Sequence, residues 1–455
     1  MTKYSDIYKI HHLHFLGIGG ISMSTLALIA HRRGYKVTGY DRAASPLTAR
    51  LENEGIRIFY ETDPAHVTPD CAVVYTAAIS PEHPELAAAL AAGIPCIPRA
   101  EYLGGIMTEY GCRIGVSGTH GKSTTTTMLA HIFDAAKLDP TVACGAVMPA
   151  YGGAYRIGGD KKHFLYESCE YTDSFLHFHP TTAVILNIEM DHVDYFHSME
   201  QLLESFTRSA DEAEILVVNA DDENAMLVGS RYAGKLVPAG INNPAALYKA
   251  ENLVDEGDGS RFTLTRAGEP LCEIFLPAPG RHYVSDALCA LAAAIENGVE
   301  PTDAAAGIAA FQRADRRFEE KGVVRGARLF DDYAHHPSEI AATLRSARPL
   351  LGEGGKLVCL FQPHTYSRTV GLLPQFIEAL SLADEVVLAP IYAAREKNTY
   401  GVSSENIAEK IPGALTLPDF AAIADYVYPR LRGGDLVLTM GAGDIWKVGT
   451  LLLEK

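Results

Sequence analysis

The stretch GTHGKST at residues 118–124 constrains the fold of this chain more than any other part of the sequence. It directly follows the strand-like RIGVS and directly precedes an apolar helical stretch. In such a turn, glycines let successive backbone N–H groups point at phosphate oxygens, Lys122 supplies positive charge, and the hydroxyl of Ser123 can bind Mg²⁺. The strict phosphate-loop pattern has a glycine where this chain has Val116. The stretch predicts a nucleoside triphosphate site between a strand and a helix, with a purely structural turn as the alternative.

The rest of the chain alternates strand and helix in three segments. The first runs from His12 to about Met107, the second begins at Arg113, and the third starts near Arg317. Each opens with a strand-like run and continues with apolar strands and helical stretches, a pattern typical of α/β layers around parallel sheets. The sequence therefore predicts an α/β protein with three domains, at residues 1–108, 109–316 and 317–455.

Composition and charge narrow the classes of partner. With 455 residues, 47% of them hydrophobic, the chain can bury several cores. Its formal net charge of −17 argues against a general nucleic-acid binder, which would carry a basic face. The start lacks the features of a secretory signal, and no apolar run approaches the ~18 residues of a membrane span. We therefore expect a cytoplasmic protein without nucleic-acid or membrane partners, either a monomer or a homodimer.

A pair of possible metal ligands lies downstream of the phosphate loop. Glu167 and His192 are 25 residues apart, each after a strand-like run. A carboxylate and an imidazole at the ends of adjacent strands can hold Mg²⁺ against a γ-phosphate, although two unrelated surface groups are the alternative. The eight cysteines, by contrast, are scattered without a CxxC pair. Their spacing fits reduced, mostly buried thiols better than disulfides or a zinc site.

The first segment has a glycine-rich loop of its own. GIGGIS at residues 17–22 follows a strand, and Asp41 ends the next strand. Taken alone, this is a dinucleotide-binding fingerprint with serine at its third glycine, and it would indicate an NAD(P)-dependent oxidoreductase. The same amide donors and helix terminus can bind any diphosphate, so the loop alone is a weak signal for a dinucleotide.

Several of these motifs together resemble the Mur ligase family. GTHGKST is similar to its GTHGK[ST]T loop, ESCEYTDSF and ILNIEMDH to its AEADES and TNIEADH motifs, and HFLGIGGISMS to HFxGIGGxGMS. RRFE at residues 316–319 and FQPHTYSRT at residues 361–369 resemble RRF[DE] and FQPHRxxRT, and the match runs in order from His14 to Trp446. The resemblance implies a Rossmann-like N-terminal domain that binds a nucleotide sugar, a central P-loop ATPase-like domain with a parallel sheet, and a Rossmann-like C-terminal domain.

The resemblance also implies a role for individual residues. ATP would be bound by Gly118, Thr119, His120, Gly121, Lys122, Ser123, Thr124, Asp286, Arg317 and Asp332. The UDP-sugar would be bound by Gly17, Gly19, Gly20, Ile21, Asp41, Thr76, Ala78 and Arg99, and the amino acid by Tyr333, His335, His364 and Arg368. Mg²⁺ would be held by Ser123, Glu167 and His192, and the catalytic set would be Lys122, Glu167, His192, Arg317 and Asp332. Taken singly, each histidine also fits a structural role, and their grouping is what favours a site.

The implied reaction joins L-alanine to the lactyl carboxylate of UDP-N-acetylmuramate, with ATP, through an acyl phosphate, in peptidoglycan precursor synthesis. A relative that adds a recycled murein tripeptide to the same nucleotide sugar is the nearest alternative, and GIGGxxM favours the L-alanine-adding member. The oxidoreductase is a more distant alternative.

Three positions depart from the family pattern. Tyr283 and Asp286 replace the two asparagines of HNVxNA, and Thr365 replaces the first arginine of FQPHRxxRT. Asp286 can still accept a hydrogen bond from an adenine amino group, or it can simply favour the first turn of a helix. The change at Thr365 removes one possible clamp for a carboxylate.

Overall fold

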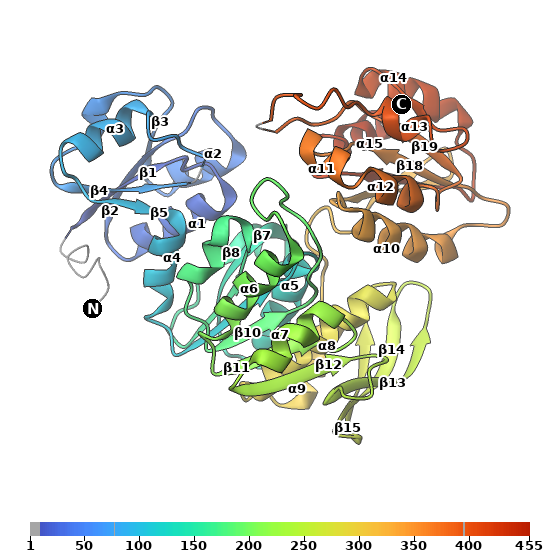
Figure 1. Cartoon of the computed structure of the whole chain (residues 1–455), viewed down its shortest axis with the longest axis horizontal. Helices are drawn as coiled ribbons and strands as arrows, with labels where there is room; N and C mark the ends of the chain where they lie inside the picture. The colour runs from blue at the N-terminus through green and yellow to red at the C-terminus, as the bar shows by residue number, and fades with distance from the viewer. Residues whose placement is uncertain (1–9, 77, 395) are drawn as a thin grey trace.

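The computed structural model describes residues 10–76, 78–394 and 396–455, which form three α/β units in succession (Figure 1). Each unit is built on its own sheet, so the predicted fold class is confirmed. In Figure 1 the N-terminal unit lies at the upper left, the C-terminal unit at the upper right, and the central unit below them. The predicted domain boundaries fall in the connections between these units, and we retain them as a proposal.

The N-terminal unit has a five-stranded sheet in the order β3-β2-β1-β4-β5, and all its strand pairs are parallel. The strands are β1 His12–Leu16, β2 Lys36–Tyr40, β3 Arg57–Phe59, β4 Cys71–Tyr75 and β5 Cys96–Pro98. The helices are α1 Ile21–Arg32, α2 Pro46–Asn53, α3 Pro84–Ala91 and α4 Arg99–Met107, with a 3-10 turn at Pro64–His66. Because β1 and β4 are neighbours, the loops that follow them lie side by side at the carboxyl edge.

The central unit has a ten-stranded sheet in the order β15-β14-β13-β12-β11-β10-β6-β9-β7-β8. Its strands are β6 Cys112–Ser117, β7 Thr141–Met148, β8 Gly153–Arg156, β9 His163–Glu167, β10 Thr182–Ile185, β11 Ile215–Asn219, β12 Lys235–Gly240, β13 Tyr248–Asp255, β14 Ser260–Arg266 and β15 Glu269–Leu276. The helices are α5 Lys122–Ala135, α6 Met199–Ala210, α7 Glu223–Arg231, α8 Arg281–Glu296 and α9 Pro301–Ala309, with 3-10 turns at Pro149–Tyr151 and Tyr171–His177.

The central sheet is parallel from β13 to β7, as predicted, but its two edges are antiparallel. The hairpins β13-β14-β15 and β7-β8 add these edge strands. Antiparallel strands need only a short turn between them and can leave one face in water, whereas parallel strands need a helical crossover and burial on both faces. Buried and more exposed residues alternate along β14, as expected for an antiparallel strand with one face in water.

The C-terminal unit has a six-stranded sheet in the order β16-β17-β21-β18-β19-β20, in which only β16 runs antiparallel. The strands are β16 Glu319–Val324, β17 Ala327–Asp332, β18 Leu357–Phe361, β19 Glu385–Leu388, β20 Leu415–Thr416 and β21 Leu436–Met440. The helices are α10 Pro337–Ala347, α11 Tyr366–Gly371, α12 Leu373–Leu380, α13 Glu405–Ala408, α14 Phe420–Val427 and α15 Trp446–Leu453, with 3-10 turns at Arg348–Leu350 and Tyr428–Arg430.

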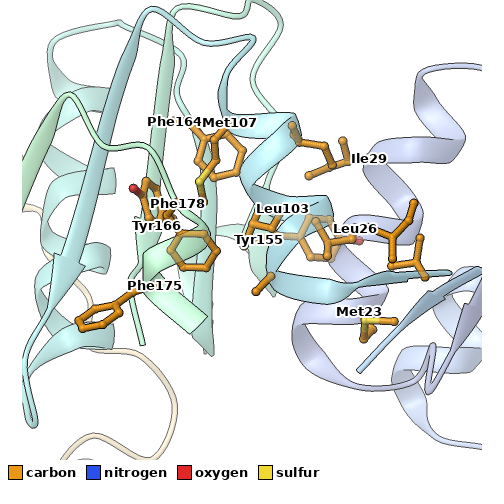
Figure 2. Packing of buried hydrophobic residues seen from close by; sticks show 14 of the residues in the cluster. Met23, Leu26, Ile29, Leu103, Met107, Tyr155, Phe164, Tyr166, Phe175 and Phe178 are labelled. Atoms are coloured by element: carbon orange, nitrogen blue, oxygen red, sulfur yellow. The ribbon is translucent and has the colours of Figure 1, made fainter. Parts of the chain in front are cut away.

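One apolar core joins the N-terminal and central units. Figure 2 shows Leu26 and Ile29 of α1 and Leu103 of α4 packed toward Tyr155 of β8 and Phe178 of the central unit. The glycine at position 104 makes this contact close, because a methyl group there would lie 2.0 Å from the carbonyl oxygen of His177. The two units therefore share one core.

Two further expectations concern the whole chain. All eight cysteines are free thiols, four of them buried and four half-buried, so their burial is less complete than the expected mostly buried thiols. None of the helices in the described part of the chain is long and apolar enough to cross a membrane.

Candidate active site

The phosphate loop lies at the carboxyl end of β6 and leads directly into α5. Gly121 precedes the helix with a φ of 82°, in the left-handed region that favours glycine. The Nζ of Lys122 donates to the carbonyls of Gly118 and Thr119 and lies 3.2 Å from the Oε2 of Glu170. Burial disfavours the ammonium, but the Glu170 carboxylate outweighs it and raises the pKa of Lys122 above its usual value. The lysine is therefore charged and held across the loop.

The loop is also fixed from the side by the segment that follows β10. The backbone N–H of His120 donates to the Oδ1 of Asn187 at 2.8 Å, and the hydroxyl of Thr119 donates to the carbonyl of Glu189 at 3.1 Å. The buried Thr124 lies in the first turn of the helix. These bonds hold the backbone in a set shape before any ligand is present.

The predicted magnesium ligands Ser123 and Glu167 flank one thiol. The Sγ of Cys144 lies 3.1 Å from the Oε1 of Glu167 and 3.7 Å from the carbonyl oxygen of Ser123. The Glu167 carboxylate also accepts the N–H of Gly145 at 2.5 Å, and a guanidinium N–H of Arg317 donates to the hydroxyl of Ser123 at 3.3 Å. A hydroxyl and a carboxylate are oxygen donors of the kind that Mg²⁺ prefers.

His192 joins this region through Glu170, a further candidate ligand within the ESCEYTDSF motif. The Nε2 of His192 lies 3.7 Å from the Oε1 of Glu170, whose other oxygen faces Lys122. The ring of His192 lies against that of Tyr171, with centroids 4.6 Å apart. Glu170 therefore connects the predicted metal ligand to the phosphate loop.

The predicted amino-acid-binding residues form a chain of contacts in the C-terminal unit. The rings of Tyr333 and His335 are 5.4 Å apart, and those of His335 and His364 are 5.9 Å apart. The guanidinium of Arg368 lies 3.2 Å from the Nδ1 of His364 and forms a buried ion pair of 2.8 Å with Asp191. Burial lowers the pKa of His335 to about 3 and that of His364 to about 4, so both imidazoles are neutral near neutral pH.

Both ends of this series of contacts lead back to the phosphate loop, so that the contacts form a closed ring. At one end, Asp191 lies 3.9 Å from the Nε2 of His192, and thus reaches Glu170 and Lys122. At the other end, the guanidinium of Arg317 lies over the ring of Tyr333, 5.1 Å from its centroid, and donates to Ser123. The structure therefore brings phosphate, metal and amino-acid candidates into one ring.

Asp332, the remaining predicted catalytic residue, lies at the end of β17 beside this ring. Its carboxylate accepts the N–H groups of Phe318 and Ala334, each at 2.7 Å. Burial raises the pKa of Asp332 to about 6. Its two hydrogen bonds fix the turns before β16 and after β17.

Several of the predicted site motifs contain backbone in the left-handed region. His192, Arg316, Phe318 and Thr365 have φ values of 51°, 59°, 51° and 66°. Such a conformation costs on the order of 1–3 kcal/mol in a residue with a side chain and concentrates at functional sites. Three of the predicted site motifs therefore carry strain that the surrounding structure must hold.

A cavity of about 210 Å³ adjoins the phosphate loop. Six of the residues predicted to bind ATP line it, namely His120, Gly121, Thr124, Asp286, Arg317 and Asp332. A methyl group at Gly121 would lie 2.5 Å from the Oδ1 of Asp286. Burial raises the pKa of Asp286 well above its usual value and favours the neutral acid, which can donate a hydrogen bond as an amide does. The hydroxyl of Tyr283 donates to the carbonyl of Arg317 at 3.4 Å, at the junction with the C-terminal unit.

The predicted UDP-sugar residues gather at the carboxyl edge of the N-terminal sheet. The N–H of Gly19 donates to the Oδ2 of Asp41 at 2.8 Å, and a methyl group at Gly17 would meet Thr76 at 2.9 Å. Gly20 donates its N–H to the carbonyl of Gly17 at 3.1 Å, and Ile21 and Ala78 are exposed.

Arg99 links this edge to the central unit. Its guanidinium donates to the hydroxyl of Ser22 at 3.1 Å. Cys169 of the central unit is close enough to feel the charge of Arg99. Burial raises the pKa of the Cys169 thiol to about 11, while the positive charges of Lys122 and Arg99 lower it. Arg99 therefore faces the segment that also carries Glu170.

The sequence reasoning missed four residues that hold the site together. Glu189 and Asp191 lie inside the quoted ILNIEMDH motif, so their carboxylates were a visible signal. Glu339 pairs with His120 and caps α10 three residues after His336, a spacing that also indicated a helix start. For Cys144 there was no signal in the sequence.

Comparison with known proteins covers nearly the whole chain. Residues 12–110 match the Mur ligase family catalytic domain, residues 116–294 the Mur ligase middle domain, and residues 316–443 the glutamate ligase domain of Mur ligases. The chain is 43% identical to the UDP-N-acetylmuramate–L-alanine ligase of Agathobacter rectalis, over 99% of each chain. It is 42% identical to the enzyme of that name from Acetivibrio thermocellus, over 99% of this chain and 97% of the relative.

Solved structures give the same result. The UDP-N-acetylmuramate–alanine ligase of Thermotoga maritima superposes with a TM-score of 0.82 at 27% identity, covering 97% of this chain and 98% of that one. A murein peptide ligase from Psychrobacter arcticus superposes with a TM-score of 0.73 at 25% identity, covering 98% of both chains.

Proposed function

We propose that this chain, which belongs to the Mur ligase family, joins L-alanine to the lactyl carboxylate of UDP-N-acetylmuramate in peptidoglycan synthesis. ATP supplies the energy and leaves as ADP and phosphate. The full-length relatives that carry the L-alanine ligase name support this substrate. Use of ATP and a nucleotide sugar fits a cytoplasmic reaction. That the protein is a monomer or a homodimer stays a prediction.

The observation that carries the proposal is the ring of contacts from Ser123 through Arg317 and the C-terminal histidines back to Lys122. A two-step ligation needs three groups side by side: a terminal phosphoryl group, a carboxylate and an amine. Positioning and charge stabilisation provide most of the catalysis in phosphoryl transfer. The ring contains a charged lysine, oxygen donors and neutral imidazoles, the kinds of group that these three reactants need, and this supports the proposal.

In the first step, a carboxylate oxygen of the nucleotide sugar attacks the γ-phosphorus, and the bond between this phosphorus and the β–γ bridging oxygen breaks. We assign Lys122 and the N–H groups at the start of α5 to the phosphate oxygens, because Glu170 holds the lysine and Asn187, which accepts the His120 N–H, fixes the loop. Arg317 reaches Ser123 from the C-terminal unit and adds a second positive charge. These charges oppose the charge that develops on the transferred group.

In the second step, the nitrogen of L-alanine attacks the acyl carbon, the tetrahedral intermediate collapses with release of phosphate, and the departing phosphate takes up the proton that the nitrogen loses. We assign the amino acid to the side of the ring formed by Tyr333, His335, His364 and Arg368. The two neutral imidazoles place no positive charge against the incoming amine. Closure of the C-terminal unit over the loop would exclude water, which otherwise hydrolyses an acyl phosphate.

Mg²⁺ fits the donor set on the central unit. Ser123 and Glu167 offer oxygen atoms, and His192 lies beside the buried Glu170 carboxylate. Bound there, Mg²⁺ would neutralise charge on the phosphate oxygens. We propose Ser123 and Glu167 for one ion and His192 for a second.

The two alternatives are not favoured. The murein peptide ligase shares the fold, but its TM-score of 0.73 is below the 0.82 of the alanine ligase. For the oxidoreductase, the same glycine-rich edge that suits a dinucleotide also suits a UDP-sugar, and the family matches span all three units.

A phosphate-release assay with UDP-N-acetylmuramate, ATP and each candidate acceptor tests the proposal. We expect turnover with L-alanine, and its loss in Lys122→Ala with an unchanged circular dichroism spectrum. Lys410→Ala is the matched control, since Lys410 is exposed in the C-terminal unit. Turnover with tripeptide but not with L-alanine would overturn the assignment, as would full activity in Lys122→Ala.

A further inference from the structure

Two histidines and a carboxylate meet at the border between the central and C-terminal units. His120 belongs to the phosphate loop, Glu189 follows β10, and His336 precedes α10. One side-chain nitrogen or oxygen atom from each of the three lies within 4.8 Å of the other two. The cluster is separate from the Ser123, Glu167 and His192 set proposed above for Mg²⁺.

The distances within the cluster suit a tetrahedral metal ion. The Oε2 of Glu189 lies 3.5 Å from the Nε2 of His120 and 3.5 Å from the Nδ1 of His336. Zinc bonds to nitrogen and carboxylate oxygen are about 2.0–2.2 Å long, which places neighbouring donors of a tetrahedron about 3.3–3.5 Å apart. Two edges of such a tetrahedron are therefore already present.

The surroundings of the three side chains hold them in the orientation that metal ligands need. The Nε2 of His120 is buried and has no hydrogen-bond partner, while its Nδ1 faces Glu339 at 3.1 Å. The Nε2 of His336 lies 3.4 Å from the carbonyl oxygen of Met190, while its Nδ1 faces Glu189 and also accepts the N–H of Ser338 at 3.4 Å, a long hydrogen bond that the metal ion would replace. Metal-binding histidines usually donate their second nitrogen to a carboxylate or carbonyl in this way. The hydroxyl of Ser338 in turn donates to Glu189.

We propose that His120, Glu189 and His336 form an inhibitory site for Zn²⁺ or a similar late transition-metal ion. Two imidazoles and one carboxylate favour such ions, whereas Mg²⁺ prefers six oxygen donors. A water molecule would complete the tetrahedron. Because His336 comes from the C-terminal unit and the other two ligands from the central unit, the ion cross-links the units. The phosphate loop is then tied to α10, and the opening that substrate exchange needs is blocked.

Direct binding is tested first, without nucleotide, by titrating the full chain with Zn²⁺ against a chromophoric chelator at a pH of about 8, where the ion must displace the proton that Glu189 and Glu339 hold on His120. We expect one tight site. His336→Asn keeps an acceptor at the start of α10, and Glu189→Gln keeps an acceptor for Ser338. Each should weaken binding by at least about 100-fold, since loss of even an outer partner costs about 10- to 100-fold. His179→Asn, at an exposed histidine beside Glu212, is the matched control and should bind as the unaltered chain does.

Inhibition is tested second and rests on the proposed ligase function. Zn²⁺ should reduce phosphate release at least about tenfold, and His336→Asn should lose this response relative to its own metal-free rate. Tight Zn²⁺ binding that survives in both folded variants would overturn the site and point to the cysteines. Absence of tight binding in the unaltered chain would also overturn it, as would binding without inhibition in an active enzyme. If the protein shows no ligase activity, the chelator titration still tests whether Zn²⁺ binds at this site.

Discussion

Where the central unit meets the N-terminal unit, aromatic and aliphatic side chains form one continuous core, whereas hydrogen bonds and ion pairs predominate where it meets the C-terminal unit. In the described chain, both apolar clusters of the C-terminal unit contain only residues from Phe318 onward. Apolar burial is non-directional and is lost whenever the surfaces separate. Polar groups, by contrast, are rehydrated on separation, so a polar boundary can open at small cost.

The difference teaches where the enzyme can move. The N-terminal unit is held against the central unit by apolar side chains such as Leu103, Tyr155 and Phe178. The C-terminal unit reaches the phosphate loop through Arg317 and Glu339, and the nearby Asp191 through Arg368. We infer that substrate binding and product release open the second boundary and leave the first one intact.

The largest expected effect is on the apolar boundary. A methyl group at Gly104 would lie 2.0 Å from the backbone carbonyl of His177, whereas nothing lies within 4 Å of one at Gly105 in the same helix. We expect Gly104→Ala to lower the free energy of unfolding by about 3 kcal/mol or more, because backbone cannot move aside easily. Gly105→Ala should be neutral or stabilising by up to about 1 kcal/mol. Urea unfolding measures both, and equal losses would contradict the shared core.

A smaller effect on stability, but a clear one on rate, is expected at the polar boundary. Burial disfavours the Asp191 charge, but the Arg368 guanidinium outweighs it and holds the pKa of Asp191 well below its usual range. In Arg368→Ala the C-terminal unit can swing away and rehydrate Asp191. We therefore expect a loss of about 1–2 kcal/mol in unfolding free energy, below the roughly 3–5 kcal/mol of a buried pair broken in place, and a loss of about 100-fold in kcat.

Thermal unfolding measures the loss of stability in Arg368→Ala, and phosphate release measures the loss of rate. Arg345→Ala on α10 is the control, because Arg345 is an exposed arginine of the same unit. A large loss of stability with an unchanged rate would show that the boundary is structural and does not move.

The smallest effect is a pH dependence of closure. Burial opposes the charge of His120, but Glu339 and Glu189 outweigh it and raise the pKa of His120 to about 9. A raised histidine pKa means that the contact is fully present below about pH 6.5, the unperturbed value, and is lost as the pH rises through about 9. Small-angle scattering should show the chain expanding over that interval, and His120→Gln should remove the response. An identical response in the variant would exclude His120 as the titrating group.

Much of the fold was open to prediction because it depends on local patterns. The GTHGKST turn, the strand before it and the helix after it follow from glycine conformations and apolar periodicity within one stretch of chain. The three α/β units follow in the same way, and the structure confirms them. The antiparallel edges of the central sheet did not follow, because strand direction depends on which strand is the neighbour.

The site, like the fold, was predictable where it depends on local motifs and not where it depends on long-range contacts. Motifs identified Lys122, Glu167, His192 and Arg368 as candidates, and their roles stay proposals. No motif predicted that Arg368 would pair with Asp191, 177 residues away, or that Glu339 would face His120. Such pairs form only when separate units close on one another.

The sequence by itself determined the kind of layers in this protein and the chemistry that its loops carry, since these depend on residue types at short spacing. Only the tertiary structure decided that one boundary is a core and the other a set of charges. The physical reason is that burial and electrostatic pairing are properties of surfaces brought together, and sequence distance does not encode which surfaces meet.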